Sequence, residues 1–154
     1  MFILQMSGVP GSGKSTLARM IAKETGAVII DHDIVKTAFL ESWEGDIDPR
    51  AAGKVCYSIE WSLIDFHLSQ GHNVILDSPC GYTVMLEKGS MLCRKYNVNY
   101  KYIECYVTDA EVLETRLRTR KRMISQMSQL MFDKADKQAY QDWLDKAKRP
   151  ADTR

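Results

Sequence analysis

The octapeptide GVPGSGKS, residues 8–15, governs how the rest of the chain is interpreted, because it fits the phosphate-loop pattern G-x-x-x-x-G-K-[ST] without a mismatch. An apolar run at residues 2–4 precedes it, and apolar residues at helical spacing follow it between residues 17 and 22. A strand, a glycine-rich turn and a helix form the context in which this pattern holds phosphate groups. The sequence therefore predicts a nucleoside triphosphate site at this loop.

The residue types in this loop have chemical reasons. Gly8, Gly11 and Gly13 permit backbone angles that turn successive N–H groups toward a polyanion. The helix that begins near Lys14 adds the positive end of its dipole. We expect Lys14 to reach the β- and γ-phosphates and the Ser15 hydroxyl to hold Mg²⁺. The residues expected to bind the nucleotide here are Gly8, Pro10, Gly11, Ser12, Gly13, Lys14, Ser15 and Thr16.

The composition bounds the class of protein. A length of 154 residues suits one domain, residues 1–154, and 45% hydrophobic with 27% charged residues is ordinary for a globular chain. The 21 Lys and Arg residues nearly balance 20 Asp and Glu residues, so no overall charge draws the chain to nucleic acid or to a membrane. We expect a cytoplasmic protein without signal peptide or membrane helix, with Cys56, Cys80, Cys93 and Cys105 as reduced thiols.

Helical and strand patterns alternate along the chain. The strands are expected at residues 2–4, 27–30, 73–77 and about 102–107. The helices are expected at residues 14–24, from 34 through 40, from about 52 until Gly71 closes the helix, at 83–96 and after a cap at Thr108 or Asp109. This alternation predicts an α/β protein with three layers, α/β/α, in which helices cover both faces of a parallel sheet.

Two further stretches have a clear pattern. Residues 41–50 are polar and carry Gly45 and Pro49, which predicts a loop. Residues 125–148 have a helical composition.

The apolar residues that we expect on the buried face of the long helix after the loop are Ala52, Val55, Cys56, Ile59, Leu63 and Phe66.

Three aspartates lie where predicted strands end, and ligands of parallel sheets bind at the carboxyl ends of strands. Asp33 is the candidate catalytic base that accepts the proton of a phosphoryl acceptor, and it is also a candidate Mg²⁺ ligand. Its alternative role is capping a helix. Asp77 resembles a Walker B aspartate that holds Mg²⁺ or its water, with turn formation as the alternative. Asp31 is expected either to support Mg²⁺ through water or to be solvated.

Basic residues complete the predicted site. Lys36, one turn after Asp33, is a candidate catalytic residue that steadies a phosphate or the acceptor. Arg116 and Arg120 are four residues apart and share one helical face. We expect Arg120 to lie over the γ-phosphate and Arg116 to contact the nucleotide. The alternative pair, Arg118 and Arg122, has the same spacing.

Four blocks in order, GVPGSGKST, VIIDHDIVK, VILDS and RLRTR, resemble the small P-loop kinases of the polynucleotide-kinase and zeta-toxin type, within the nucleoside monophosphate kinase-like fold. The resemblance implies a P-loop NTPase fold with a helical lid over about residues 116–130. It also implies ATP and Mg²⁺ as cofactors, Asp33 as general base, an assisting Lys36 where the polynucleotide kinases carry arginine, and Arg120 at the lid position. Ser78 follows Asp77 where motor ATPases commonly carry a water-activating glutamate, which favours transfer over hydrolysis.

Two departures from that group bear on function. Four strands are visible, and the chain stops at residues 148–154, where the related kinases begin a fifth strand and an adenine-enclosing loop, so we expect a C-terminus truncated relative to the family. Residues 31–48 carry six carboxylates against Lys36 alone, which disfavours the phosphates of a nucleic acid.

The sequence therefore favours an ATP-dependent kinase whose partners are a nucleoside triphosphate and a small molecule with an acceptor hydroxyl. A kinase for the 5′-hydroxyl of polynucleotides is the alternative within the same class. A nucleotide-binding regulatory ATPase without acceptor chemistry is the alternative of another class. A GTPase switch lacks support, because the chain has no N-K-x-D sequence for guanine.

Overall fold

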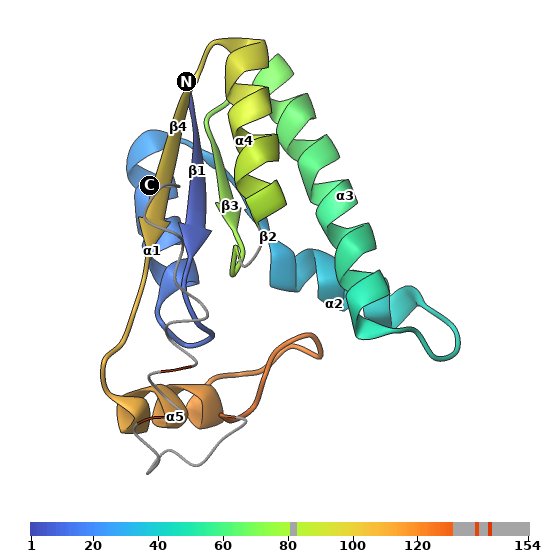
Figure 1. Ribbon diagram of the computed structural model, residues 1–154, viewed down its shortest axis with the longest axis vertical. Helices are drawn as coiled ribbons and strands as arrows, with labels where there is room; N and C mark the ends of the chain where they lie inside the picture. Colours follow the sequence, from blue (N-terminus) through green and yellow to red (C-terminus); the bar gives the residue numbers. More distant parts are fainter. Residues whose placement is uncertain (81–82, 131–137, 139–141, 143–154) are drawn as a thin grey trace.

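The structure is a computed structural model that describes residues 1–80, 83–130, 138 and 142 (Figure 1). No helix in this described part is long and apolar enough to cross a membrane. Strands and helices alternate as β1 (Phe2–Ser7), α1 (Lys14–Thr25), β2 (Val28–Asp31), α2 (His32–Ser42), α3 (Pro49–Ser69), β3 (Val74–Asp77), α4 (Thr83–Tyr96), β4 (Asn99–Glu104) and α5 (Ala110–Thr119).

The four strands form one parallel sheet in the order β2-β3-β1-β4. The central strand β1 sets the register: Ile3 lies opposite Val74 of β3 and Tyr100 of β4, and Ile30 of β2 lies opposite Leu76 of β3. Because all strands run the same way, their carboxyl ends meet at one edge of the sheet. The predicted α/β class and the four-stranded parallel sheet are confirmed.

Helices cover both faces of the sheet, with α3 and α4 on one face and α1 on the other (Figure 1). Successive residues of β1 point to opposite layers. Ile3 packs in a buried cluster with Trp61 and Leu68 of α3, whereas Leu4 packs with Ala18 of α1. The α5 helix lies beyond the carboxyl ends of the strands, so it covers the edge of the sheet and not a face (Figure 1).

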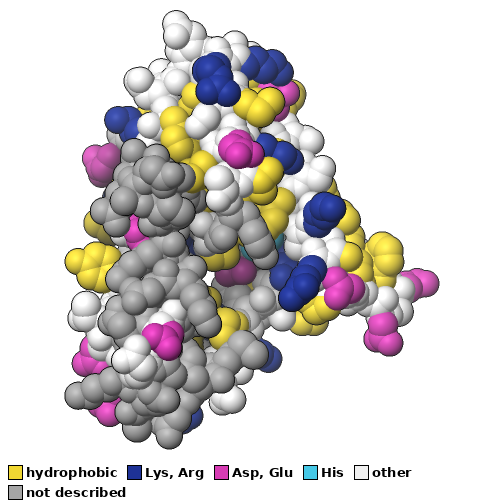
Figure 2. All heavy atoms as spheres, viewed as in Figure 1, with side chains coloured by type: hydrophobic (Ala, Val, Ile, Leu, Met, Phe, Trp, Pro, Cys, Tyr) yellow, Lys and Arg dark blue, Asp and Glu magenta, His cyan; other side chains and the backbone are white. Residues whose placement is uncertain are grey.

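The buried face of α3 differs from the predicted one. Ala52 and Cys56 are buried as expected, but the inner face continues through Glu60, Trp61, Ile64 and Leu68. Apolar residues occur around most of this helix, so helical periodicity alone does not predict which face is buried. The buried face is the one that contacts the sheet. Hydrophobic side chains reach the surface on the side of the molecule where α3 lies (Figure 2). The predicted core residues that are instead 38% to 57% exposed are Val55, Ile59, Leu63 and Phe66.

Two other boundaries differ from the predictions, whereas the cap of α5 is one of the two predicted residues. The β4 strand covers Asn99–Glu104 and not residues 102–107, because it aligns with β1 from Phe2↔Asn99 to Ser7↔Glu104. The cap of α5 is Asp109, whose carboxylate accepts the N–H groups of residues 111 and 112. Within the predicted lid region, α5 ends at Thr119, and residues 120–130, the lid segment, are not helical. Most of the predicted helical stretch 125–148 lies outside the described residues.

The observed face of α3 predicts how two leucines differ. Leu68→Ala removes a side chain that is 1% exposed, and we expect a loss of about 2–5 kcal/mol of unfolding free energy. Leu63→Ala trims a side chain that is 38% exposed and should change the unfolding free energy by less than about 1 kcal/mol. Urea denaturation followed by circular dichroism measures both. Equal losses in the two variants would contradict the orientation of α3.

Candidate functional site

The loop between β1 and α1 requires its glycines. Gly8, Gly11 and Gly13 have φ values of 124°, 83° and 98°, a region that disfavours side chains. A Cβ atom on Gly8 would overlap the carbonyl oxygen of Cys105, just after β4. Gly13 caps α1 without a side-chain hydrogen bond, so the first N–H groups of α1 have no side-chain acceptor there. The loop is therefore a tight turn that presents a helix N-terminus, suited to an anion.

Lys14 is folded back over this loop. Its Nζ donates hydrogen bonds to the carbonyl oxygens of Gly8, at 2.8 Å, and Val9, at 3.0 Å. Burial lowers the pKa of Lys14, while the negative charges of Asp77 and Asp33 act in the opposite direction. The ammonium group thus lies inside the loop, close to two of the aspartates at the strand ends.

Ser15 and Asp77 bring two kinds of oxygen ligand together. Asp77 at the end of β3 is 4% exposed and shares a side-chain hydrogen bond with Ser15. Burial raises the pKa of Asp77, and the bond to Ser15 opposes that shift. A hydroxyl and a carboxylate fit Mg²⁺, a hard cation that usually keeps waters and binds substrate phosphates as well. The described part of the chain contains no preformed group of three His, Cys, Asp or Glu side chains for a metal.

Asp31 and Asp33 have different tasks at the start of α2. Asp31 caps the helix, and its Oδ1 accepts the N–H groups of Asp33, at 2.9 Å, and Ile34, at 3.4 Å. The capping role that was the alternative for Asp33 therefore belongs to Asp31. Burial raises the pKa of Asp31, and the charge of Asp77 adds to this effect. The carboxylate of Asp33 is left for other contacts.

Asp33 is contacted from the lid segment. Gln126 Nε2 donates a hydrogen bond to Asp33 Oδ2 at 2.7 Å. Ser125 Oγ donates to the Asp33 carbonyl oxygen at 3.1 Å and lies 3.5 Å from Oδ1. Neither lid residue was predicted, because no sequence motif or period marks the turn in which they lie.

A buried hydrogen bond between two side chains supports the first turn of α2. His32 Nδ1 lies 2.7 Å from Oε1 of Glu60 on α3, and its ring stacks on Tyr57 with centroids 4.3 Å apart. Glu60 is fully buried, and burial raises its pKa while the bond from His32 opposes the shift. Neither His32 nor Glu60 was among the predicted site residues. No local signal separates Glu60 from Asp65, the other acidic residue of α3, because both stand between apolar neighbours.

The arginines of α5 separate into two groups. Arg116 Nη1 donates to the Gly11 carbonyl at 3.3 Å, and Arg120 Nη2 donates to the Met127 carbonyl at 2.8 Å. Arg118 instead forms an ion pair with Glu114 at 2.7 Å. Arg116 therefore contacts the phosphate loop and Arg120 contacts the lid segment, and their roles toward a nucleotide remain predictions.

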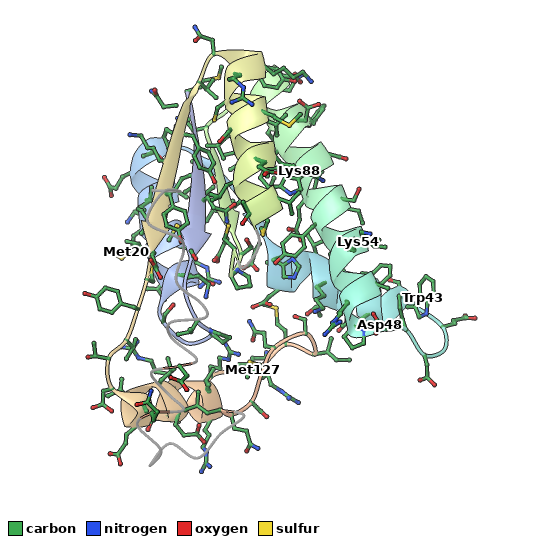
Figure 3. The ribbon with its side chains drawn as sticks, in the orientation of Figure 1. Met20, Trp43, Asp48, Lys54, Lys88 and Met127 are labelled. Atoms are coloured by element: carbon green, nitrogen blue, oxygen red, sulfur yellow. The ribbon has the colours of Figure 1, made fainter. Side chains whose placement is uncertain are left out.

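These elements enclose one cleft of about 890 Å³. Its walls are the phosphate loop, the first turns of α2, the end of β3, the end of α5 and the lid segment, on which Met127 is labelled in Figure 3. Gly8 is the one predicted site residue outside the lining. The predicted residues in the lining are Pro10, Gly11, Ser12, Gly13, Lys14, Ser15, Thr16, Asp31, Asp33, Lys36, Asp77, Arg116 and Arg120.

Solved structures share this fold. A proposed kinase from Chloroflexus aurantiacus j-10-fl aligns with a TM-score of 0.66 and 21% identity, over 77% of this chain and 65% of that chain. A chain of the Pnkp1/Rnl/Hen1 complex aligns with a TM-score of 0.59 and 20% identity, over 86% of this chain and 43% of that chain. The tunicamycin resistance protein of Deinococcus radiodurans aligns with a TM-score of 0.59 and 13% identity, over 94% of this chain and 78% of that chain. The chain thus spans less than two thirds of the first two proteins, and these identities show the fold alone.

The sequence itself matches one family over nearly its whole length. Residues 3–147 match the family AAA_33, described as an AAA domain. A search of curated proteins gives no match. The match and the shared fold confirm the resemblance to P-loop kinases at the level of family and fold. The chain belongs to the AAA domain family AAA_33 and has the α/β fold of the P-loop kinases.

Proposed function

We propose that this protein is an ATP-dependent kinase that transfers the γ-phosphate to a hydroxyl group of a small molecule. The observation that carries the proposal is the position of Asp33. Its carboxylate is released from helix capping by Asp31 and lies in the same cleft as Lys14, whose pKa responds to its charge. A carboxylate and an ammonium beside a phosphate loop are the groups that phosphoryl transfer to a hydroxyl requires.

In this mechanism the phosphate loop, Lys14 and Arg116 hold the triphosphate. Lys36 and Arg120 act on the transferring group, because both line the cleft, Lys36 from α2 and Arg120 from the end of α5. Ser15 and Asp77 would hold Mg²⁺, with Asp33 as a further candidate ligand. The bound metal supplies positive charge against the phosphate oxygens.

The chemical step is an in-line transfer of the γ-phosphoryl group from ATP to the acceptor hydroxyl. The oxygen of the acceptor hydroxyl forms a bond to the γ-phosphorus, and the bond from that phosphorus to the β–γ bridging oxygen breaks. The acceptor proton passes to Asp33, and ADP leaves with the bridging oxygen. Arginine and lysine side chains neutralise the charge that spreads over the γ-phosphate oxygens.

The location of the protein is also part of the proposal. Cys56, Cys93 and Cys105 are free thiols, and Cys56 and Cys93 are buried. Free thiols persist in the reducing cytoplasm, where ATP is abundant. We therefore expect the enzyme to act there.

Asp33→Asn tests the proposed base. Asparagine keeps the size of the side chain but takes up no proton, so we expect phosphoryl transfer to fall by about 10²- to 10⁴-fold while nucleotide affinity stays within about twofold. Transfer is measured with labelled ATP and a panel of nucleosides, sugars, aminoglycosides and a 5′-hydroxyl oligonucleotide. Asp48→Asn is the matched control, because Asp48 caps α3 outside the cleft (Figure 3) and asparagine caps equally well. Unchanged turnover in Asp33→Asn would remove Asp33 from the mechanism.

The two groups of arginines give a second test. Arg116→Ala should raise the Kd of a non-hydrolysable ATP analogue about tenfold, because a charged hydrogen-bond donor is lost beside the loop. Arg118→Ala breaks the ion pair with Glu114 and should leave that Kd within about twofold. Isothermal titration calorimetry measures both constants. The reverse order of effects would favour the alternative arginine assignment.

A kinase for polynucleotide 5′-hydroxyl groups is the second candidate, favoured by the alignment of 86% of this chain with a chain of the Pnkp1/Rnl/Hen1 complex. If it is correct, the oligonucleotide in the panel is the preferred acceptor. Its use should then fall steeply as salt rises, because phosphate contacts release counterions. Phosphorylation of a small acceptor that changes little with salt would exclude this candidate. ATP binding without transfer to any acceptor would indicate a regulatory protein.

A further inference from the structure

The lid segment carries a preformed turn directed at Asp33. The Gln126 N–H donates to the Met123 carbonyl at 3.0 Å, and the Met123 N–H donates to Gln126 Oε1 at 3.1 Å. The carbonyl oxygen of the Gln126 side chain is thus used within the turn. Its amide nitrogen is left to donate outward, and it does so to Asp33.

Three uncharged polar side chains surround Asp33. Thr37 Oγ1, one turn further along α2, lies 2.9 Å from Ser125 Oγ. Ser125 in turn contacts the backbone and the carboxylate of Asp33, and Gln126 covers Oδ2. The two walls of the cleft are therefore joined by hydroxyl and amide groups, and Asp33 is the charged member of this group.

We propose that Ser125 and Gln126 form the acceptor subsite, with Thr37 bonded to Ser125 behind it, and that this subsite selects a neutral molecule with adjacent hydroxyl groups. The inference rests on the proposed kinase function. A hydroxyl that gives its proton to Asp33 can take the position on Oδ2 where the Gln126 amide now donates. The displaced amide then donates to the oxygen of that hydroxyl or of its neighbour, and the Ser125 hydroxyl can both donate and accept.

The same contacts connect acceptor binding to the arginine of the lid. Arg120 Nη2 binds the carbonyl of Met127, the residue after Gln126, and its Nε is buried without a hydrogen-bond partner in the described part of the chain. An acceptor that holds Ser125 and Gln126 also holds the backbone to which Arg120 is bound. Binding of the acceptor to Ser125 and Gln126 therefore also fixes the backbone that holds the Arg120 side chain.

The first experiment measures binding without turnover. Lys121 and Arg122 are exposed trypsin sites at the start of the lid segment. With a saturating non-hydrolysable ATP analogue, millimolar glucose, ribose or myo-inositol is added, and each is paired with its phosphate ester. We expect at least one neutral probe to slow cleavage at these sites about three- to tenfold, the effect of about one hydrogen bond, and the esters to act less. No protection by any neutral probe, or stronger protection by the esters, would overturn the proposal.

Matched variants assign the effect to the two side chains. Gln126→Ala and Ser125→Ala should abolish the protection, whereas Gln129→Ala and Ser128→Ala alter exposed residues of the same segment and should retain it. In the transfer assay, Gln126→Ala should raise the acceptor KM about three- to tenfold and leave the ATP KM within about twofold. An unchanged acceptor KM would mean that the contact with Asp33 is only structural. Protection without phosphoryl transfer in the wild type would contradict the kinase function and leave the subsite standing.

Discussion

The close approach of Gly8 to the Cys105 carbonyl is the contact on which the site depends. It joins the end of β1 to the segment after β4, where the Cys105 N–H also bonds the Ser7 carbonyl at 2.8 Å. From there the chain leads into α5, whose Leu113 and Leu117 pack close to Gly11. A side chain at Gly8 would push the phosphate loop away from the segment after β4. This backbone contact therefore fixes the phosphate loop against the segment after β4, and that segment leads into α5 with its arginines.

Electrostatics at the edge of the sheet follow from this arrangement. The carboxylates of Asp31, Asp33 and Asp77 lie close enough for the charge of each to affect another, and burial raises the pKa of Asp31 and Asp77. Burial lowers the pKa of Lys14 among them. Such a group gains from any cation that arrives with a polyphosphate, because the cation offsets both the repulsion and the loss of hydration.

The sequence predicted well what local chemistry determines. The phosphate loop, the start of α1 at Lys14 and the strand-end position of Asp77 follow from motif, glycine content and apolar runs. It predicted poorly what depends on distant contacts. Leu63 and Leu68 are both apolar residues of α3, and only the position of the sheet decides which is buried. The approach of Gln126 to Asp33 joins residues 93 positions apart, which no local pattern encodes.

The folded-back Lys14 has a consequence for which ligands the loop retains. Its ammonium group already has two acceptors, the carbonyl oxygens of Gly8 and Val9. A ligand with a single phosphate that does not extend to Nζ leaves both bonds in place and gains nothing from the lysine. A longer phosphate chain replaces them with charged oxygens, which are stronger acceptors. We therefore expect the loop to hold a phosphate chain that reaches Nζ more firmly than a single phosphate that does not.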